Sequence, residues 1–271
     1  MKKSEETPQR VAVVGAGTMG TGIARLALEA GIPVLLFDIS DTASEEARMA
    51  LAAIGHLDVQ VAREVTEIGN CPVVIDATPE KPGKSHVLAS LAKHASPDAL
   101  LGTLTLATPV AALSDTDILR GRLVGFHFMN PPHRLRFCEL VLPATVAPAL
   151  ADRARALVAH LGVSVVEVKD SSGFVLNRAL IPFFFSAVRV LEEGLASNED
   201  IDRSFVEGCA HPMGPLRILD LIGLDVAIRI GEFLTATTGG ESCRPPDLLY
   251  ALVAQGKLGR AAGEGLHSYG V

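Results

Sequence analysis

A glycine-rich turn near residue 15 constrains the fold of this chain more than any other segment. The β-favouring run 10–14 leads directly into it, and a helical pattern of apolar residues follows and ends at Gly31. Within the sequence GAGTMG, Gly15 permits a tight bend, Gly17 lets the backbone approach a phosphate, and Gly20 lets helix and strand pack closely. The N–H groups at a helix N-terminus attract an anion. This strand–turn–helix unit therefore predicts a dinucleotide site.

An acidic residue at the end of the next predicted strand indicates which dinucleotide binds. That strand is 33–37, and Asp38 follows it about 20 residues after the glycines, where a carboxylate can accept hydrogen bonds from a ribose 2′-OH. It would repel a 2′-phosphate, and no arginine lies just after it to receive one. We therefore expect NAD rather than NADP. The residues expected to bind it in this stretch are Gly15, Gly17, Thr18, Met19, Gly20 and Asp38.

Strand and helix signals continue to alternate up to about residue 170. Further strands are predicted at 64–68, 73–77, 99–103, 123–128 and 163–168, and helices at 44–53, 87–91 and 149–161. The run 73–77 is apolar throughout, as expected of a strand that a parallel sheet buries on both faces. The sequence therefore predicts an α/β domain at 1–170 with a Rossmann-type, doubly wound, mostly parallel sheet.

The rest of the chain, 171–271, shows only helical patterns and is predicted to be an all-α domain. Helices are expected at 175–195, 216–237 and 246–255, and a further helix is expected to begin at Asn198, which would cap it. The run 181–190 is apolar on more than one helical face and contains three consecutive phenylalanines. A helix of this kind is typical of an interface, so we expect a homodimer formed through this domain.

Two ionisable residues lie on apolar runs that a Pro-Pro turn joins within 124–141. The pair, His127 and Glu139, suits acid–base chemistry: a neutral imidazole can remove a proton from an alcohol, and a carboxylate bonded to its other nitrogen fixes the tautomer. His127 also falls at the C-terminal end of its predicted strand, where open α/β sheets bind ligands. The stretch alone is equally compatible with a second interpretation without chemistry. In it, His127 is a core histidine bonded to a backbone carbonyl, and Glu139 is an unrelated strand glutamate.

Composition narrows the classes of partner. The net charge is -7, and there is no tryptophan and no Lys/Arg-rich run, which argues against nucleic acid or an anionic membrane. The four cysteines are widely spaced and form no CxxC pair, so we expect neither a metal site nor a disulfide framework. No signal segment is apparent, and the longest apolar run is too short to span a bilayer. We therefore expect a cytoplasmic protein that acts on a small metabolite.

Six segments, in order along the chain, resemble the 3-hydroxyacyl-CoA dehydrogenase family, including its 3-hydroxybutyryl-CoA dehydrogenases. They are GAGTMGTGIA (15–24), HFMNP (127–131), GFVLNR (173–178), HPMGP (211–215), LDLIGLD (219–225) and GKLGRAAGEG (256–265). The resemblance implies NAD-dependent oxidation of the 3-hydroxyl of an acyl thioester, with a helical dimerisation domain and the substrate between the domains. It also implies that His127 is the catalytic base, Glu139 its orienting acid, Asn177 a substrate ligand and Glu80 an acid near the cofactor.

Two features depart from the family pattern. Leu106 stands where a serine usually touches the substrate hydroxyl; Thr105 or Thr108 could supply that contact, or could simply satisfy backbone groups in the loop. The helical hairpin that helps to bind CoA in the family is also shortened between Asp38 and Asp76. The substrate could thus be a CoA thioester, an acyl-carrier-protein thioester or a small free hydroxy acid. A dinucleotide-binding protein with impaired catalysis is a further alternative.

Overall fold

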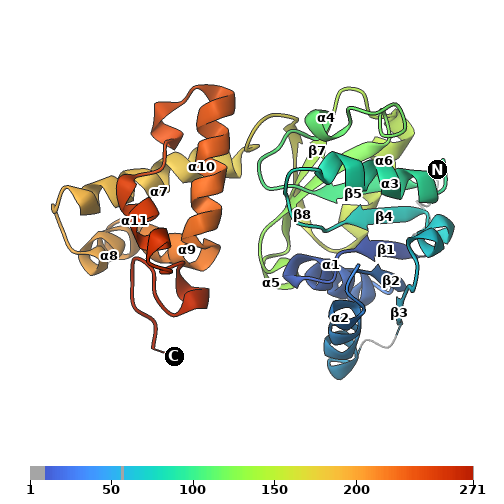
Figure 1. Cartoon of the computed structure of the whole chain (residues 1–271), viewed down its shortest axis with the longest axis horizontal. Coiled ribbons are helices and arrows are strands. Elements are labelled where there is room, and N and C mark those ends of the chain that lie inside the picture. Colours follow the sequence, from blue (N-terminus) through green and yellow to red (C-terminus); the bar gives the residue numbers. More distant parts are fainter. Residues whose placement is uncertain (1–9, 56–57, 271) are drawn as a thin grey trace. The chain divides into compact units, whose positions relative to one another are not determined.

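The computed structural model describes residues 10–55 and 58–270, and the chain divides into two compact units (Figure 1). The first unit ends at Ser171 and contains a β-sheet with its helices, and the second begins at Ser172 and is helical. The predicted fold class, a mostly parallel sheet followed by an all-α domain, is confirmed.

The described strands of the first unit form one sheet of eight strands in the order β3-β2-β1-β4-β5-β6-β7-β8. Their bounds are β1 Val11–Val14, β2 Val34–Phe37, β3 Val59–Val61, β4 Val73–Asp76, β5 Leu100–Leu104, β6 Leu123–Phe128, β7 Phe137–Leu142 and β8 Ser164–Lys169. Strands β1 to β6 are parallel, β7 is antiparallel to β6, and β8 is parallel to β7. The chain winds from β1 towards β3 and then from β4 in the other direction. The switch point, where such sheets bind ligands, therefore lies between β1 and β4.

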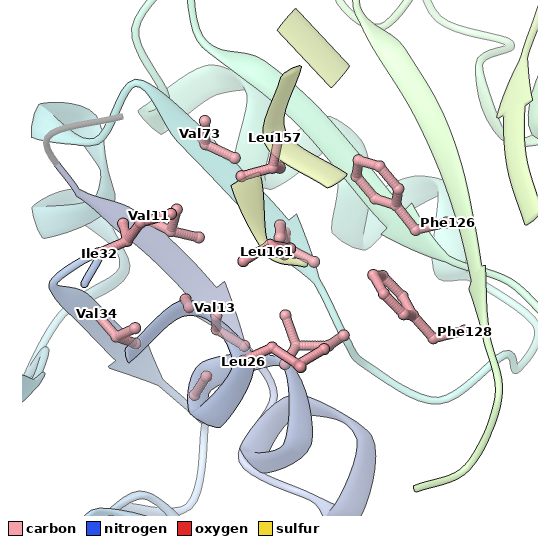
Figure 2. Packing of buried hydrophobic residues seen from close by; sticks show 14 of the residues in the cluster. Val11, Val13, Leu26, Ile32, Val34, Val73, Phe126, Phe128, Leu157 and Leu161 are labelled. Atoms are coloured by element: carbon pink, nitrogen blue, oxygen red, sulfur yellow. The ribbon is translucent and has the colours of Figure 1, made fainter. Parts of the chain in front are cut away.

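Helices cover both faces of this sheet. They are α1 Thr18–Glu29, α2 Asp41–Ala53, α3 Lys84–His94, α4 Val110–Leu113, α5 Pro132–Leu135 and α6 Pro148–His160. Leu26 of α1 and Leu157 of α6 belong to one apolar cluster with Val13 of β1, on one face of the sheet (Figure 2). Ala12 and Val74 alternate to the opposite face and are equally buried. Burial on both faces explains why β1 is apolar throughout and why β4 is apolar up to its last residue, Asp76.

One predicted strand is wrong. Residues 64–68 do not form a strand: β3 lies earlier, and a 3₁₀ helix, η1 Val65–Asn70, follows it. The Glu67 carboxylate accepts hydrogen bonds from the N–H groups of Arg63 (2.7 Å) and Glu64 (3.1 Å), while the Glu64 side chain caps the first turn. This reciprocal capping box satisfies backbone donors that a strand would pair with a neighbour.

The second unit consists of helices in its described part. They are α7 Leu176–Glu192, α8 Asn198–Cys209, α9 Pro215–Ile222, α10 Leu224–Thr238 and α11 Asp247–Ala254, with short 3₁₀ helices η2 Glu241–Cys243 and η3 Arg260–Ala262. Among all described helices, none is both long and apolar enough to cross a bilayer.

Two sequence predictions for this unit need correction. Ser197, not Asn198, caps α8: its Oγ accepts the N–H of Asp200 at 3.1 Å, whereas the Asn198 amide donates to the carbonyl of Leu266 at 2.6 Å. The expected helix 216–237 is two helices, because Gly223 takes φ +99° and ψ 125° between α9 and α10. An apolar periodicity that continues across a glycine does not reveal such a break.

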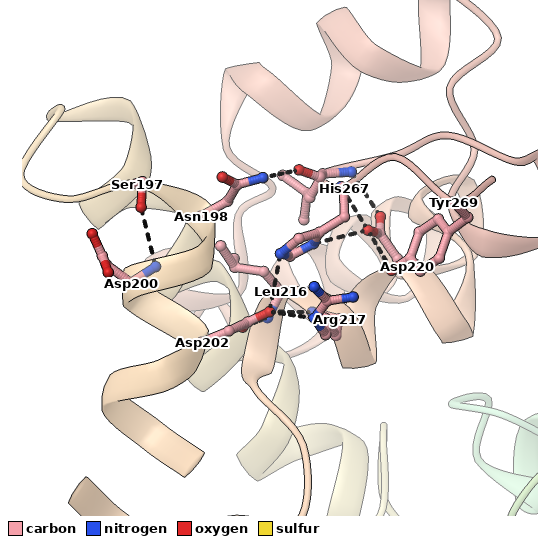
Figure 3. A network of polar contacts seen from close by, with 10 residues as sticks. Ser197, Asn198, Asp200, Asp202, Leu216, Arg217, Asp220, His267 and Tyr269 are labelled. Carbon is pink, nitrogen blue, oxygen red and sulfur yellow. Dashed lines mark hydrogen bonds and ion pairs between the residues drawn. The ribbon is translucent and has the colours of Figure 1, made fainter. Parts of the chain in front are cut away.

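Two buried carboxylates tie the C-terminal segment to α8 and α9 (Figure 3). Asp220 accepts the N–H groups of Leu266 (2.8 Å) and His267 (2.9 Å) and the hydroxyl of Tyr269 (2.9 Å). The His267 ring lies between Asp220 and Asp202, with Nδ1 3.3 Å from one carboxylate and Nε2 3.2 Å from the other. Burial raises the pKa of Asp202. The polar groups of the tail thus replace water around these carboxylates.

We predict that Gly223→Ala destabilises the protein by about 1–3 kcal/mol, because only glycine adopts this backbone conformation without strain. The matched control is Gly208→Ala on α8, where an added Cβ meets nothing within 4 Å; an alanine there should stabilise by about 0.5–1 kcal/mol. Urea unfolding of both variants measures the difference. Equal stabilities would contradict the conformational argument.

Candidate active site

The antiparallel pairing of β6 and β7 sets His127 directly opposite Glu139. Nδ1 of the imidazole lies 2.6 Å from Oε2 of the carboxylate, and the two residues are only 4% and 1% exposed. They are therefore a bonded pair, not a histidine bonded to a backbone carbonyl beside an unrelated glutamate. Because a carboxylate accepts, Nδ1 carries the proton and Nε2 keeps the lone pair. A histidine in this tautomer is equipped to act as a base through Nε2.

Cys138 lies beside this pair in β7 but has no chemical role in it. Burial raises the pKa of its thiol, and the neighbouring Glu139 carboxylate raises it further. The thiol thus stays protonated at neutral pH, and a protonated thiol is a poor nucleophile.

The turn between β6 and β7 is anchored on α1. Pro132 packs so closely on Gly22 that a Cβ at that glycine would lie 2.8 Å from the proline Cδ. Arg136, with φ +41°, ends the turn and forms an ion pair with Glu29 of α1. The same carboxylate also binds Arg25 at 2.7 Å. The guanidinium of Arg136 is thus already paired within its own unit.

The glycine turn has the geometry that a dinucleotide requires. Gly15 has φ +104°, and a Cβ there would lie 2.9 Å from the carbonyl of Ala77; a Cβ on Gly20 would lie 1.8 Å from the Gly15 oxygen. A Cβ on Gly17 would meet nothing within 4 Å among the described residues. Gly17 is also the N-cap of α1, and no side chain caps that helix. Gly15 and Gly20 therefore serve packing, whereas Gly17 borders open space at a helix N-terminus, which fits a pyrophosphate.

Asp38 follows β2 and is held beside the glycine turn. Its Oδ2 accepts the N–H of Ala16 at 2.8 Å, and its Oδ1 accepts the N–H of Ser40 at 2.9 Å. Each carboxylate oxygen can accept a second hydrogen bond, so the group can still receive ribose hydroxyls. Its position fits NAD.

Glu80 holds a loop at the carboxyl end of β5. Its carboxylate accepts the N–H of Thr108 at 3.0 Å, the Thr108 hydroxyl and the N–H of Leu106. The Thr105 hydroxyl donates to the carbonyl of Thr108 at 2.9 Å. Leu104, the last residue of β5, pairs with Phe126, the residue before His127, so the loop begins where β6 carries the imidazole. Glu80 thus braces the loop from outside, where it also receives the Thr108 hydroxyl, and the Thr105 hydroxyl braces the loop from within.

Asn177 is the second residue of α7 and belongs to the helical unit. Gly173 and Phe174, just before this helix, both have positive φ. The remaining proposed residues belong to the first unit. Among the described residues, no three or more His, Cys, Asp or Glu side chains are grouped so that they could hold a metal ion.

A buried ion pair at the end of β4 was not predicted from the sequence. Asp76 and Lys84 are 1% and 4% exposed, and their charged atoms lie 2.8 Å apart. A lysine that follows a glycine at a helix start looks like an ordinary surface residue. An aspartate that ends an otherwise apolar strand was the available signal.

A dinucleotide turn at the switch point and a buried His–Glu pair at the same edge of the sheet define a nicotinamide-dependent dehydrogenase. Residues 10–171 match the family described as the NAD binding domain of 3-hydroxyacyl-CoA dehydrogenase. Residues 173–269 match the family described as the C-terminal domain of the same enzyme. The chain therefore belongs to the 3-hydroxyacyl-CoA dehydrogenase family, as the sequence resemblance indicates. It is an NAD-binding oxidoreductase.

Relatives in this family align over nearly the whole chain. A 3-hydroxybutyryl-CoA dehydrogenase of Mycobacterium tuberculosis is 34% identical over 283 residues, which cover 96% of this chain and 98% of the relative. The crystal structure of M. tuberculosis FadB2 superposes with a TM-score of 0.91 at 33% identity and covers 98% of this chain and 100% of its own. (S)-3-hydroxybutyryl-CoA dehydrogenase PaaH1 of Ralstonia eutropha also has a TM-score of 0.91, at 31% identity, with coverage of 97% and 100%.

The glycine turn generates a prediction that separates binding from folding. Gly17→Ala should leave the free energy of unfolding within about 0.5 kcal/mol of wild type but weaken NADH binding at least tenfold, about 1.4 kcal/mol, because the methyl group enters the space of the pyrophosphate. Gly20→Ala should destabilise the fold by about 3 kcal/mol, because its methyl group meets a backbone carbonyl. Urea unfolding and NADH fluorescence titration measure the two effects. A Gly17→Ala protein that binds NADH normally would place the pyrophosphate elsewhere.

Proposed function

We propose that this protein interconverts a short-chain 3-hydroxyacyl thioester and the 3-oxoacyl thioester. The observation that carries the proposal is the buried bond between His127 and Glu139 at the carboxyl end of β6. The short chain is suggested by the names of relatives, several of which are 3-hydroxybutyryl-CoA dehydrogenases.

In the proposed mechanism, His127 Nε2 removes the proton of the substrate 3-hydroxyl. Bound NAD would supply the acceptor for the hydride that leaves the carbon bearing this hydroxyl. The Glu139 carboxylate accepts a hydrogen bond from Nδ1–H throughout and stabilises the imidazolium that forms. In the reverse direction the protonated ring returns its proton to the ketone oxygen. The hydroxyl proton thus goes to His127, and the hydride from the same carbinol group goes to the cofactor.

The cofactor is proposed to lie along the glycine turn. Its pyrophosphate would meet the backbone of Gly17, Thr18 and Met19, in a turn whose shape Gly15 and Gly20 set by close packing, and its adenosine ribose would meet Asp38. Glu80 is proposed to act on the cofactor side by fixing the loop 105–108 beside the nicotinamide. The support is the geometry of the turn and the three hydrogen bonds that Glu80 accepts from this loop.

Asn177 is proposed to donate a hydrogen bond to a substrate oxygen, as the family resemblance implies. Thr105 and Thr108 remain candidates for a contact with the substrate, but only as hydrogen-bond acceptors. The Thr105 hydroxyl already donates to the carbonyl of Thr108, and the Thr108 hydroxyl donates to Glu80, so towards a substrate each can only accept. A hydroxyl that only accepts cannot polarise a ketone, which leaves that task to Asn177 and to protonated His127.

A homodimer through the helical unit is proposed from the apolar surface of α7 and α8. A cavity of about 270 Å³ lies there, and its lining includes Phe183, Val190, Leu195, Ile201 and Phe205. The Leu195 side chain is largely exposed in the single chain. We also propose that the protein works in the cytoplasm, because its four cysteines are free thiols, as expected in a reducing compartment.

A second candidate substrate is an acyl-carrier-protein thioester or a small free hydroxy acid. The observation that favours it is the connection from β2 to β4, where the described residues form only α2, β3 and η1. The long helical hairpin that the resemblance attributes to the family is absent from the described residues of this connection, in line with the short spacing between Asp38 and Asp76. A protein with impaired catalysis is disfavoured by the intact His127–Glu139 bond.

We predict that His127→Gln lowers kcat by about 10²–10⁴ while NADH affinity stays within twofold of wild type, because the ring transfers a proton and does not hold the dinucleotide. Glu139→Gln should lose less, since the amide oxygen can still accept from Nδ1. Stopped-flow reduction of acetoacetyl-CoA and NADH titration measure both quantities. A His127→Gln enzyme with near wild-type turnover would remove the mechanism.

The carrier can be tested by shortening the thiol. Binding energy from the remote nucleotide of CoA normally appears in the rate, so a chain that makes few contacts with it should lose little when it is removed. We expect acetoacetyl-pantetheine to be used within about tenfold of acetoacetyl-CoA in kcat/KM, a difference of about 1.4 kcal/mol.

A thousandfold preference for CoA would contradict this expectation and would eliminate the carrier-protein and free-acid candidates. Arg134, in the turn after His127, would then be the first residue to substitute, because Arg136 is paired with Glu29.

A further inference from the structure

The side chains of His127 and Glu139 share one face of the sheet with a glycine. Side chains two residues apart on a strand point to the same face, as do the side chains of paired residues. Gly125 lies two residues before His127 and pairs with Val141 of β7, just as His127 pairs with Glu139. Phe126, between Gly125 and His127, belongs to the apolar cluster on the opposite face (Figure 2). Whatever lies over Gly125 therefore also borders the acid–base pair.

Helix α4 covers this face at the glycine. Val110, its first residue, is fully buried, and a Cβ added to Gly125 would lie 2.5 Å from Val110 Cγ2. The absence of a side chain at Gly125 thus makes room for Val110, which occupies space beside the pair that water would otherwise fill. Where water is excluded, the bond between an imidazole and a carboxylate is stronger, because no water competes for the Nδ1 proton.

A carboxylate from the edge of the sheet holds the start of α4. The helix has only four residues, so its first N–H groups need acceptors from outside. The N–H groups of Val110 and Ala111 donate to Oδ1 and Oδ2 of Asp170, at 2.7 Å each. Asp170 directly follows β8, the last strand of the sheet. One hydrogen bond on each oxygen fixes both the distance and the direction of the helix start.

We propose that Asp170 is a positioning residue for the acid–base pair: it holds the start of α4, and with it Val110, over the face on which His127 and Glu139 lie. The inference rests on the proposed role of this pair and deepens it, because it names a residue that acts on the pair through Val110. Without this tie, α4 would move away from Gly125, and water would reach the bond between the imidazole and the carboxylate.

The test weakens the tie and follows the Nδ1 proton of His127. Asp170→Asn keeps the shape of the side chain, but only one of its two terminal atoms can accept, and the other opposes a backbone N–H. The proton is observed by NMR in protein with isotope-labelled histidine, as the signal that His127→Gln lacks. We expect its exchange with water to become about tenfold faster. An unchanged exchange rate in the folded variant would overturn the inference.

The matched control is Asp202→Asn, because Asp202 ties the start of another helix in the same way. Its carboxylate accepts the N–H groups of Leu216 (2.8 Å) and Arg217 (3.2 Å) in the first turn of α9. This variant should lower stability and leave the exchange of the Nδ1 proton unchanged. Equal acceleration in both variants would show a general loosening of the protein and would also overturn the inference.

Turnover separates this inference from the proposed function. In Asp170→Asn we expect kcat to fall about tenfold while NADH Kd stays within about twofold of wild type, because the variant disturbs the pair and not the glycine turn. A raised NADH Kd with normal Nδ1 exchange would place the effect of Asp170 on the cofactor side and overturn the inference. Faster exchange with unchanged kcat would support the role of Asp170 and contradict the acid–base role of His127.

A second variant decides the case if Asp170→Asn does not fold. Val110→Ala keeps both hydrogen bonds to Asp170 and shortens only the side chain over Gly125. Exchange of the Nδ1 proton should again be faster, because the space beside the pair opens to water. Exchange at the wild-type rate would show that this wall does not protect the pair, and the inference would fall.

Discussion

The bond between His127 and Glu139 depends on the point where the sheet changes direction: β7 and β8 run antiparallel to β1–β6, and the change falls between β6 and β7. Because β7 is antiparallel to β6, a turn of a few residues suffices to bring a glutamate twelve positions later directly opposite the histidine. A parallel neighbour would need a crossover connection of a dozen residues or more before pairing could begin. The reversal of β7 is therefore what allows one short hairpin to carry both members of the pair, and the anchoring of its turn on α1 fixes the register.

Three carboxylates keep the surroundings of this pair in place. Glu80 binds the backbone at Leu106 and Thr108, and Asp170, just after β8, accepts the N–H groups of Val110 and Ala111 at 2.7 Å each. The segment that follows β5 is thus held from the β4 side and from the end of β8. Asp76 in turn fixes the segment that carries Glu80. Donors that would otherwise need water are satisfied by charged acceptors, so the edge of the sheet is organised before any ligand binds.

The sequence predicted the parts of the fold that depend on local pattern. The strand 123–128 and the glycine turn were predicted correctly because apolar runs and glycine spacing are local signals. The bond between His127 and Glu139 could not be derived from their spacing alone, since it depends on register. The break at Gly223 and the burial of Lys84 were missed for a similar reason. A positive φ and a partner at the end of another element are both set by tertiary structure, and neither leaves a pattern in the neighbouring residues.

The motifs by which the chain resembles its family have two different roles: some maintain the fold, and others carry the groups proposed for chemistry. In the helical unit, Gly214 and Gly265 lie against carboxylates: a Cβ would be 2.2 Å from Asp202 at the first and 2.0 Å from Asp220 at the second. These glycines let buried acids reach backbone donors, so their motifs maintain a fold and say nothing of the substrate. The motifs at the carboxyl edge of the sheet bear on chemistry through His127 and Glu139. The motif GFVLNR of the helical unit carries Asn177, the proposed substrate ligand. The two places where the chain departs from its family, the loop at Leu106 and the connection from β2 to β4, lie outside all of these motifs, and we expect discrimination among thioesters to arise there.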